Sequence, residues 1–592
     1  MKVKGTRQSV GPMTLAFRRI RNAIRPRVKV YKMPAGIHAD WNVPVIVRDG
    51  TTLRVNVFRP EGGAPVPVIM SAHPYGKDEI PARTRSGRGL NLQYRLFPQP
   101  HPIEISEWTS WEAPDPGVWV PRGYAVVNVD LRGGGTAEGV GELFSDQEAL
   151  DFHDVIEWAG TQSWSSGRVG LNGVSYLAIS QYKVAALRPP HLAAICPWEG
   201  FSDLYRDFAR PGGVREDGFT IVWDKGLKRG GVRTNTEFRK EIASRPERDD
   251  WYESTAPDLG RIDVPVLVCG SFSDHSLHTR GSFEVFRHAG SALKSLYTHR
   301  DGKWCAFYGK EATAARGRFF DHTLKGLDNG WEKEPPVRLA IYDNGPEPVA
   351  VAGEQTWPPE DLQWRALGLD ARGRTLADAP ADGPPASASF DTSRDMVEFT
   401  WTVQEDIDII GPMALRLHVE VQGADDVFLF AGVRKFRGGV EMQFEGSFGF
   451  SGDMVSKGWQ RAAHRELDEE RSSASQPVHR HRISEPLRAG EIVPVDIALQ
   501  PHATRFLRGD VLRLDIRGTW HFPGDPLRGQ FPSGYQGSTK AICVLHTGGS
   551  FDARLLAGTR PVSMTTAKSG AGPKPADAAK GSPAGRVDPA SG

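Results

Sequence analysis

The sequence predicts an α/β protein in which a mostly parallel, helix-covered sheet is followed by an antiparallel β-sandwich. In the first half, short apolar runs such as residues 67–72 and 264–270 alternate with helical patterns, which is typical of a sheet covered on both faces. From about residue 336, runs such as 413–421 and 511–516 alternate apolar and polar side chains between turn-rich segments. This second pattern indicates antiparallel strands.

Composition excludes several classes of protein. The 592 residues carry 73 Lys and Arg against 72 Asp and Glu, a net charge of +1, which argues against a nucleic-acid partner. No run of 18 apolar residues is present, so we expect no transmembrane segment. The four cysteines form no C-x-x-C pair, which favours reduced thiols in a cytoplasmic protein and argues against a cysteine zinc site.

The two ends differ from the body. Residues 1–35 form a basic arm with no acidic residue before Asp40, and residues 14–24 fit one short amphipathic helix. Two hypotheses remain for this arm: contact with a membrane surface or another anionic partner, or packing on its own domain. Residues 559–592 are predicted to be a disordered tail, because Ala, Gly, Pro and Ser dominate it.

The first candidate for chemistry is Ser175, in Gly173-Val174-Ser175-Tyr176-Leu177. Other Gly-x-Ser triplets occur in the chain, but Ser175 is the one that lies between a buried strand and a helix. A tight strand-to-helix turn exposes a serine hydroxyl for nucleophilic attack. The backbone N–H of Tyr176 would then be one donor of an oxyanion hole.

The acid and the base should follow Ser175 in that order. Asp274 follows strand 264–270, and His299 ends the next apolar stretch, so we predict that His299 accepts the serine proton and Asp274 orients it. Local alternatives are His275, His278 and His288 for the base and Asp301 for the acid. A second oxyanion donor is the hydroxyl of Tyr75, at the end of strand 67–72.

These segments resemble the cocaine esterase and X-Pro dipeptidyl-peptidase-like hydrolases, the CocE/NonD family. The resemblance is carried by Pro74-Tyr75-Gly76-Lys77, by the Ser175 segment, and by Gly458-Trp459 and residues 512–516 near the C-terminus. It implies an α/β-hydrolase core with a helical cap insertion and a C-terminal all-β jelly-roll (galactose-binding-like) domain. It also implies the same triad and a Tyr75 oxyanion role. Leu177 is expected at its place in this family, whereas Ala178 replaces the family's usual glycine.

The predicted division of the chain has five parts. They are a basic N-terminal arm at 1–35, a catalytic domain at 36–200 and 260–335, a cap insertion at 201–259, a jelly-roll β-sandwich domain at 336–558 and a tail at 559–592.

Two long insertions, residues 76–118 and 201–259, carry tryptophans that are candidates for the substrate pocket. These candidates are Trp108, Trp111, Trp223 and Trp251. A histidine group, His464, His479 and His481, lies among arginines that oppose a cation, and no other metal or nucleotide signature has the required context. We therefore predict no metal and no organic cofactor.

The predicted function is a serine hydrolase that cleaves a small-molecule carboxylic ester or amide through an acyl-enzyme on Ser175. One alternative is an acyltransferase that uses the same triad with an acceptor other than water. Another is a peptidase or ester hydrolase specific for X-Pro or α-amino acids, which would need acids such as Glu199 or Asp203 to hold an ammonium group. A third is a binding protein without catalysis. A homo-oligomer is compatible with all of them.

Overall fold

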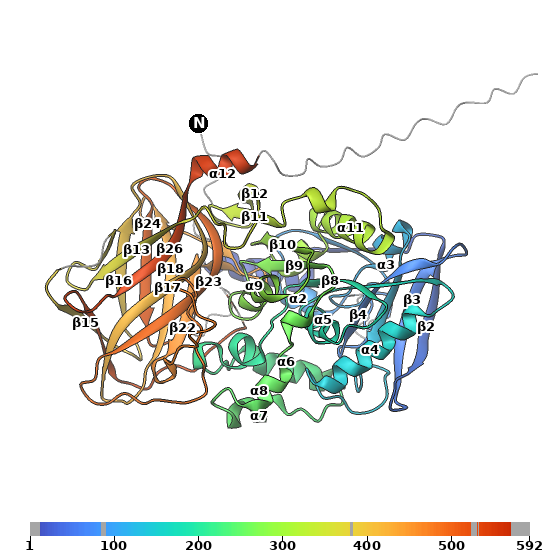
Figure 1. Ribbon diagram of the computed structural model, residues 1–592, viewed down its shortest axis with the longest axis horizontal. Helices are drawn as coiled ribbons and strands as arrows, with labels where there is room; N and C mark the ends of the chain where they lie inside the picture. Colours follow the sequence, from blue (N-terminus) through green and yellow to red (C-terminus); the bar gives the residue numbers. More distant parts are fainter. Residues whose placement is uncertain (1–11, 84–89, 379–382, 523–529, 531, 570–592) are drawn as a thin grey trace, which may run out of the picture.

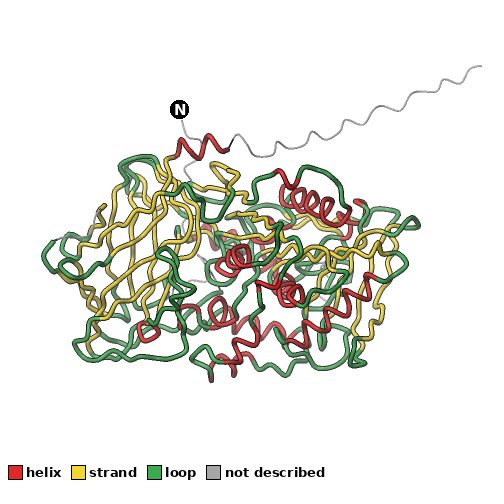
Figure 2. Tube along the Cα trace, viewed as in Figure 1, coloured by secondary structure: helices red, strands yellow, loops and turns green. Residues whose placement is uncertain are grey.

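The computed structural model describes residues 12–83, 90–378, 383–522, 530 and 532–569. A helix-rich part and a β domain almost free of helices lie side by side (Figures 1 and 2). This confirms the predicted succession of a helix-covered mixed sheet and a C-terminal β domain. Within the described residues, no helix has the length and apolar character needed to cross a membrane.

The central sheet has the strand order β2-β3-β6-β4-β7-β8-β9-β10-β11-β12. In this order, the strands from β6 through β4 to β11 pair in parallel. At the two ends of the sheet, β2, β3 and β12 pair antiparallel with their neighbours. The bounds are β2 Ile37–Ile46, β3 Thr52–Pro60, β4 Val66–His73, β6 Ala125–Asp130, β7 Ser165–Val174, β8 Leu192–Trp198, β9 Val266–Ser271, β10 Lys294–His299, β11 Val337–Tyr342 and β12 Pro348–Glu354.

Both faces of this sheet are buried under other elements, and successive side chains of each strand point into the two faces in turn. On β4, Val68 and Met70 belong to the core beneath the first group of helices, whereas Ile69 belongs to the core on the other face. The first core includes side chains of α4 (Asp146–Gly160), α5 (Tyr176–Ala186) and α9 (Thr279–His288), and the second includes those of α11 (Lys310–Lys325). Because these strands run in parallel, their carboxyl ends lie at one edge of the sheet.

A helical insertion separates β8 from β9 and lies along one side of the molecule (Figure 1). Its elements are η2 (Leu204–Ala209, a π-helix), η3 (Pro211–Gly213), α6 (Phe219–Arg229), α7 (Phe238–Ser244), α8 (Asp250–Thr255) and η4 (Leu259–Arg261). They occupy the stretch where the sequence predicts a cap. Below we call this insertion the cap.

The β domain is organised around two long antiparallel strands, β17 (Ile407–Gln422) and β23 (Val493–Phe506). The other strands are β13 Gln363–Asp370, β14 Thr375–Asp378, β15 Ala386–Asp391, β16 Met396–Thr402, β18 Phe428–Arg437, β19 Val440–Met442, β20 Phe444–Glu445, β21 Ser451–Asp453, β22 Ser456–Arg461, β24 Val511–Arg517, β25 Ile542–Thr547 and β26 Arg554–Pro561. A parallel pairing of Tyr342 with Thr504 joins the domain to the central sheet.

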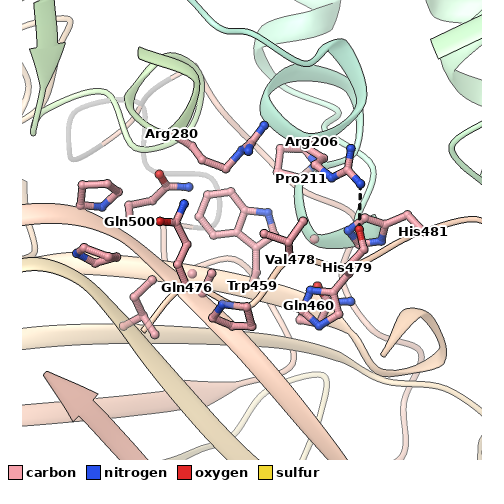
Figure 3. A pocket seen from close by; sticks show the side chains of 17 residues that line it. Arg206, Pro211, Arg280, Trp459, Gln460, Gln476, Val478, His479, His481 and Gln500 are labelled. Carbon is pink, nitrogen blue, oxygen red and sulfur yellow. Dashed lines mark hydrogen bonds between the residues drawn. The ribbon is translucent and has the colours of Figure 1, made fainter. Parts of the chain in front are cut away.

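A cavity of about 80 Å³ lies at the seam between the cap and the β domain (Figure 3). Arg206 of η2 crosses this seam and donates from Nη2 to the backbone oxygen of His479 at 2.9 Å. His479 and His481 line the cavity. Burial, aided by the Arg206 charge and opposed by Asp496, lowers the pKa of His479 to about 4. The imidazole groups predicted not to bind metal therefore form part of a domain junction.

Both ends contact the folded body. Helix α1 (Pro12–Ile24) packs beside α2 (Leu92–Leu96), and β1 (Val28–Tyr31) pairs in parallel with β5 (Ile103–Ser106). At the other end, residues 559–569, predicted as tail, instead complete β26 and form α12 (Val562–Ser569), which contacts β12. The rest of the predicted tail, residues 570–592, and the first 11 residues of the arm lie outside the described residues.

Candidate active site

Ser175 lies at the turn between β7 and α5 with φ 59° and ψ −116°. A positive φ in a residue other than glycine is strained and is held by its surroundings. Here the Ser175 N–H donates to the backbone oxygens of Trp198 (3.1 Å) and Glu199 (3.2 Å). Gly173 is also required, because a Cβ there would lie 2.4 Å from Leu177 Cβ. This geometry is that of a nucleophile elbow.

His278 is the imidazole that contacts this serine. Its Nε2 lies 3.2 Å from Ser175 Oγ, and its Nδ1 lies 2.5 Å from Asp274 Oδ2. The two residues are brought together by a turn before α9, in which the His278 N–H donates to the backbone oxygen of Asp274 at 3.1 Å. Ser175, His278 and Asp274 therefore form a continuous chain from hydroxyl to imidazole to carboxylate.

His299, the predicted base, lies elsewhere, and this is a correction. It ends β10, its Nε2 lies 3.0 Å from Glu199 Oε1, and its ring stacks on Trp198. Its Nδ1 accepts the N–H of Asp301 at 3.2 Å. The His299 side chain therefore contacts Glu199, whereas the imidazole next to Ser175 is that of His278. The spacing of four between Asp274 and His278, which one helical turn brings together, is the signal that could have identified the pair.

Lys303 begins α10 (Lys303–Phe307), four residues after His299, the predicted base at the end of β10. Its Nζ lies 2.9 Å from Asp274 Oδ2 and 3.1 Å from His278 Nδ1. Burial opposes charge on Asp274, but Lys303 and His278 hold the pKa of this carboxyl well below its usual range. Burial and the Lys303 charge also lower the pKa of His278. Asp274 therefore has two partners, His278 and Lys303, where a simple triad has the histidine alone.

Two further carboxylates lie in the electrostatic field of Lys303. Glu112 accepts a hydrogen bond from Trp304 Nε1 at 2.9 Å, and burial raises its pKa to about 7. Glu199 is fully buried beside His299. Together with Asp274, these carboxylates raise the pKa of Lys303 against the effect of burial, so the ammonium group stays charged.

Some of these groups could approach a metal ion. Ligand atoms of Glu199, Asp274 and His278 lie within 4.8 Å of one another, as do those of Glu199, Cys269 and His299. The ammonium group of Lys303 already neutralises Asp274 at 2.9 Å. The first group is consequently satisfied by the protein's own cation, which weakens the case for a bound metal there.

The predicted oxyanion donors lie next to the elbow. The Tyr75 ring lies 6.0 Å from that of Tyr176, and Tyr75 Oη accepts a hydrogen bond from Trp223 Nε1 at 3.0 Å. Because this bond uses the oxygen as acceptor, the hydroxyl hydrogen is left to donate. Burial raises the pKa of Tyr75 above its ordinary value, so the donor stays protonated. The Tyr176 N–H opens α5, where the first N–H groups have no partner inside the helix.

Of the four predicted pocket tryptophans, Trp223 is the one that contacts a candidate catalytic side chain. Trp108 packs on Trp41 and Phe58. Trp111 is buried against Tyr94 and Trp304, and Trp251 packs on Tyr252 and Arg245. Trp223 instead joins an aromatic wall above the elbow, made of Phe144, Tyr176, Phe201, Phe208, Trp223 and Phe238.

The β domain contacts Asp274, which the sequence did not reveal. Ser447, between β20 and β21, donates from Oγ to Asp274 Oδ2 at 3.3 Å, and its N–H donates to the backbone oxygen of Ser273 at 2.9 Å. Gln530 Nε2 donates to the same Ser273 oxygen at 2.8 Å. The β domain therefore helps to fix the turn that carries Asp274.

A serine on a strand-to-helix elbow, bonded through imidazole to a carboxylate at the carboxyl edge of a parallel sheet, defines the α/β-hydrolase class of serine enzymes. Comparison with known families agrees. Residues 49–300 match the X-Pro dipeptidyl-peptidase (S15) family, and residues 329–555 match the X-Pro dipeptidyl-peptidase C-terminal non-catalytic domain.

The chain superimposes on a CocE/NonD family hydrolase from Staphylococcus aureus with a TM-score of 0.83 and 35% identity, over 89% of this chain and 97% of that one. It therefore belongs to the CocE/NonD family of hydrolases. It is 32% identical to cocaine esterase of a Rhodococcus species over 56% of this chain and 62% of that relative. It is 25% identical to a putative Xaa-Pro dipeptidyl-peptidase of Bacillus anthracis, over 51% and 56%. The match thus spans less than two thirds of these two curated relatives.

Proposed function

We propose that this protein hydrolyses a small carboxylic ester through an acyl-enzyme on Ser175, with His278 as the base. The observation that carries the proposal is the chain of contacts from Ser175 Oγ to His278 Nε2 (3.2 Å) and from His278 Nδ1 to Asp274 Oδ2 (2.5 Å). Membership in a serine hydrolase family supports it.

In the first half-reaction, His278 Nε2 takes the Ser175 proton while Oγ bonds to the carbonyl carbon. The oxygen of the tetrahedral intermediate accepts hydrogen bonds from the Tyr75 hydroxyl and the Tyr176 N–H. His278 then gives its proton to the leaving alcohol as the carbon–oxygen bond breaks. In the second half-reaction, water loses a proton to His278 and attacks the acyl carbon. The bond from this carbon to Ser175 Oγ then breaks, His278 returns the proton to Oγ, and the acid is released.

An ester fits the described site better than an X-Pro or α-amino-acid substrate. Such substrates carry an ammonium group that needs an available carboxylate. Glu199 lies against His299 at 3.0 Å, and Asp203 is bound by Arg206 at 2.7 Å and Arg248 at 3.3 Å. Of the two acids that the sequence offered for this role, Asp203 is thus already bound by two arginines, and Glu199 is buried against an imidazole. Acyl transfer to an acceptor other than water finds no support in the comparisons.

The finer features of the architecture belong to the same proposal. The β domain would be a jelly roll, and the cap would cover the acyl pocket with Trp223. The C-terminal family match and the bond from Trp223 to Tyr75 support these assignments.

Labelling with a fluorophosphonate and hydrolysis of short-chain nitrophenyl esters test this function. We expect Ser175→Ala to abolish labelling, and His278→Ala to lower kcat/KM by about 10⁴-fold or more. His299→Ala is the matched control, since it removes a buried imidazole that does not contact Ser175, and most of the activity should remain. Loss of labelling in His299→Ala with retention in His278→Ala would refute the assignment.

A further inference from the structure

Helix α1 places its apolar side chains outward. Met13, Phe17, Ile20 and Ile24 are all exposed, Phe17 by 65% and Ile20 by 60%. Their spacing of four, three and four residues puts them on one stripe of the helix. In a helix that only packs on its own domain, such a stripe would face the core.

The opposite side of α1 holds it to the body. Leu15 and Asn22 are buried, and Asn22 Nδ2 donates to the backbone oxygens of Tyr94 at 2.9 Å and Arg95 at 3.0 Å. Arg18 Nη1 also donates to Ser451 Oγ at 3.3 Å, and Arg95 Nη1 donates to the backbone oxygens of Ala23 and Ile24 at 3.2 Å each. These contacts leave the apolar stripe exposed. The neighbouring helix α2 adds exposed Leu92 and Leu96.

The stripe is accompanied by positive charge. Arg18, Arg21, Arg25 and Arg27 are exposed on and just after α1, and no acidic residue precedes Asp40. Lys29 and Lys32, farther along, are paired with Glu104 and Glu107, so the excess charge is concentrated at the helix.

We propose that α1 docks the protein on the surface of an anionic lipid bilayer. An exposed apolar stripe bordered by arginines is the pattern of a helix that lies in the membrane interface, with apolar side chains among the acyl chains and guanidinium groups at the lipid phosphates. A second copy of the chain fits less well, because it would bring two sets of arginines together. The attachment is reversible, since a single short helix inserts few side chains.

Vesicle sedimentation of the full chain tests this inference and does not depend on its activity. We expect binding to vesicles of phosphatidylglycerol and phosphatidylcholine, weaker binding to phosphatidylcholine alone, and weakening by salt. The double variant Phe17→Ser/Ile20→Ser should bind at least about tenfold more weakly. Arg21→Gln/Arg25→Gln should lose about tenfold on anionic vesicles only.

Ile483→Ser is the matched control, because Ile483 is exposed by 62% in the β domain. It should bind like the wild type, and all variants should unfold at nearly the wild-type temperature. Failure of the wild type to bind vesicles, or equal loss in Ile483→Ser, would overturn the proposal. Concentration-dependent dimers that the double variant abolishes would assign the stripe to a second copy instead. Binding to soluble polyglutamate without vesicle binding would assign it to an acidic protein.

Discussion

At the scale of single residues, the distinctive feature is that Asp274 serves both His278 and Lys303. In a simple triad the carboxylate stabilises the imidazolium that forms during attack. Here the Lys303 ammonium, 2.9 Å from the same carboxylate oxygen and 3.1 Å from His278 Nδ1, offsets part of that stabilisation. His278 therefore remains neutral, and able to accept a proton, at lower pH than it would beside Asp274 alone.

We expect Lys303→Met to move the acidic limb of kcat/KM toward higher pH by about one pH unit or more. The sign follows from charge, because removal of the ammonium raises the pKa of His278, and the protonated imidazole cannot act as base. The pH profile of kcat/KM measures the shift.

Lys457→Met is the control for that profile. Lys457 is also fully buried, pairs with Asp453 at 2.6 Å and lies 3.2 Å from His275 Nδ1, but it does not contact the triad. Its loss should lower stability and leave the acidic limb in place. An unshifted limb in Lys303→Met would show that the lysine is structural only.

Part of the candidate site could be predicted from the sequence. Ser175 could be placed because a buried strand and a helix flank it, and Asp274 because it follows a core strand. The sequence predicts His299 as the base, but His278 also lies near the carboxyl end of a core strand. Apart from the four-residue spacing between Asp274 and His278, the direction of the two side chains separates them. His299 lies against Glu199, whereas the turn before α9 directs His278 toward Ser175.

At the scale of elements, local patterns predicted the core helices closely. The apolar spacing in the sequence predicts helices over residues 147–159 and 176–187. The structure has α4 (Asp146–Gly160) and α5 (Tyr176–Ala186) at these places. Helix α12 was missed because its segment, Val562–Ser569, has weak periodicity and precedes a tail-like composition. It is helical where it contacts β12, β17 and β26, a tertiary effect that sequence periodicity does not report.

The elbow depends on close approach between its strand and its helix. We expect Gly173→Ala to lower the free energy of unfolding by about 1–3 kcal/mol and to reduce kcat. The reason is that the Cβ of the new alanine would lie 2.4 Å from Leu177 Cβ. Urea unfolding and ester hydrolysis measure the two effects.

Gly226→Ala provides the comparison, since Gly226 lies inside α6 with no atom within 4 Å of an added Cβ. Alanine should there stabilise the helix by up to ~1 kcal/mol. Equal effects of the two substitutions would mean that the elbow tolerates a side chain at position 173.

At the scale of the whole molecule, the loop after β10 is anchored in the β domain. The guanidinium group of Arg300 is fully buried and donates to the backbone oxygens of Met454 and of Val455, the latter at 3.0 Å. The ring of Phe444 lies 4.0 Å from its Cζ. Because this loop leads directly into α10, which begins at Lys303, the position of the ammonium group depends on this anchor.

We expect Arg300→Leu to lower the free energy of unfolding by about 2–4 kcal/mol, since two buried carbonyls lose their donor. It should also reduce kcat. Arg416→Leu, which breaks an ion pair with Asp496 inside the β domain, should cost stability without reducing kcat. Unchanged kcat in Arg300→Leu would show that the two domains are catalytically independent.

The bonds from Ser447 and Gln530 to the Asp274 turn have a consequence for synthesis of the protein. A growing chain that has emerged to about residue 430 already contains Ser175, Asp274 and His278, yet the groups that fix the acid-bearing turn have not been made. Since domains emerge and fold in order from the N-terminus, the turn that carries Asp274 gains these contacts only after residues as far as Gln530 have been made. Fixation of this turn therefore waits for synthesis of most of the β domain.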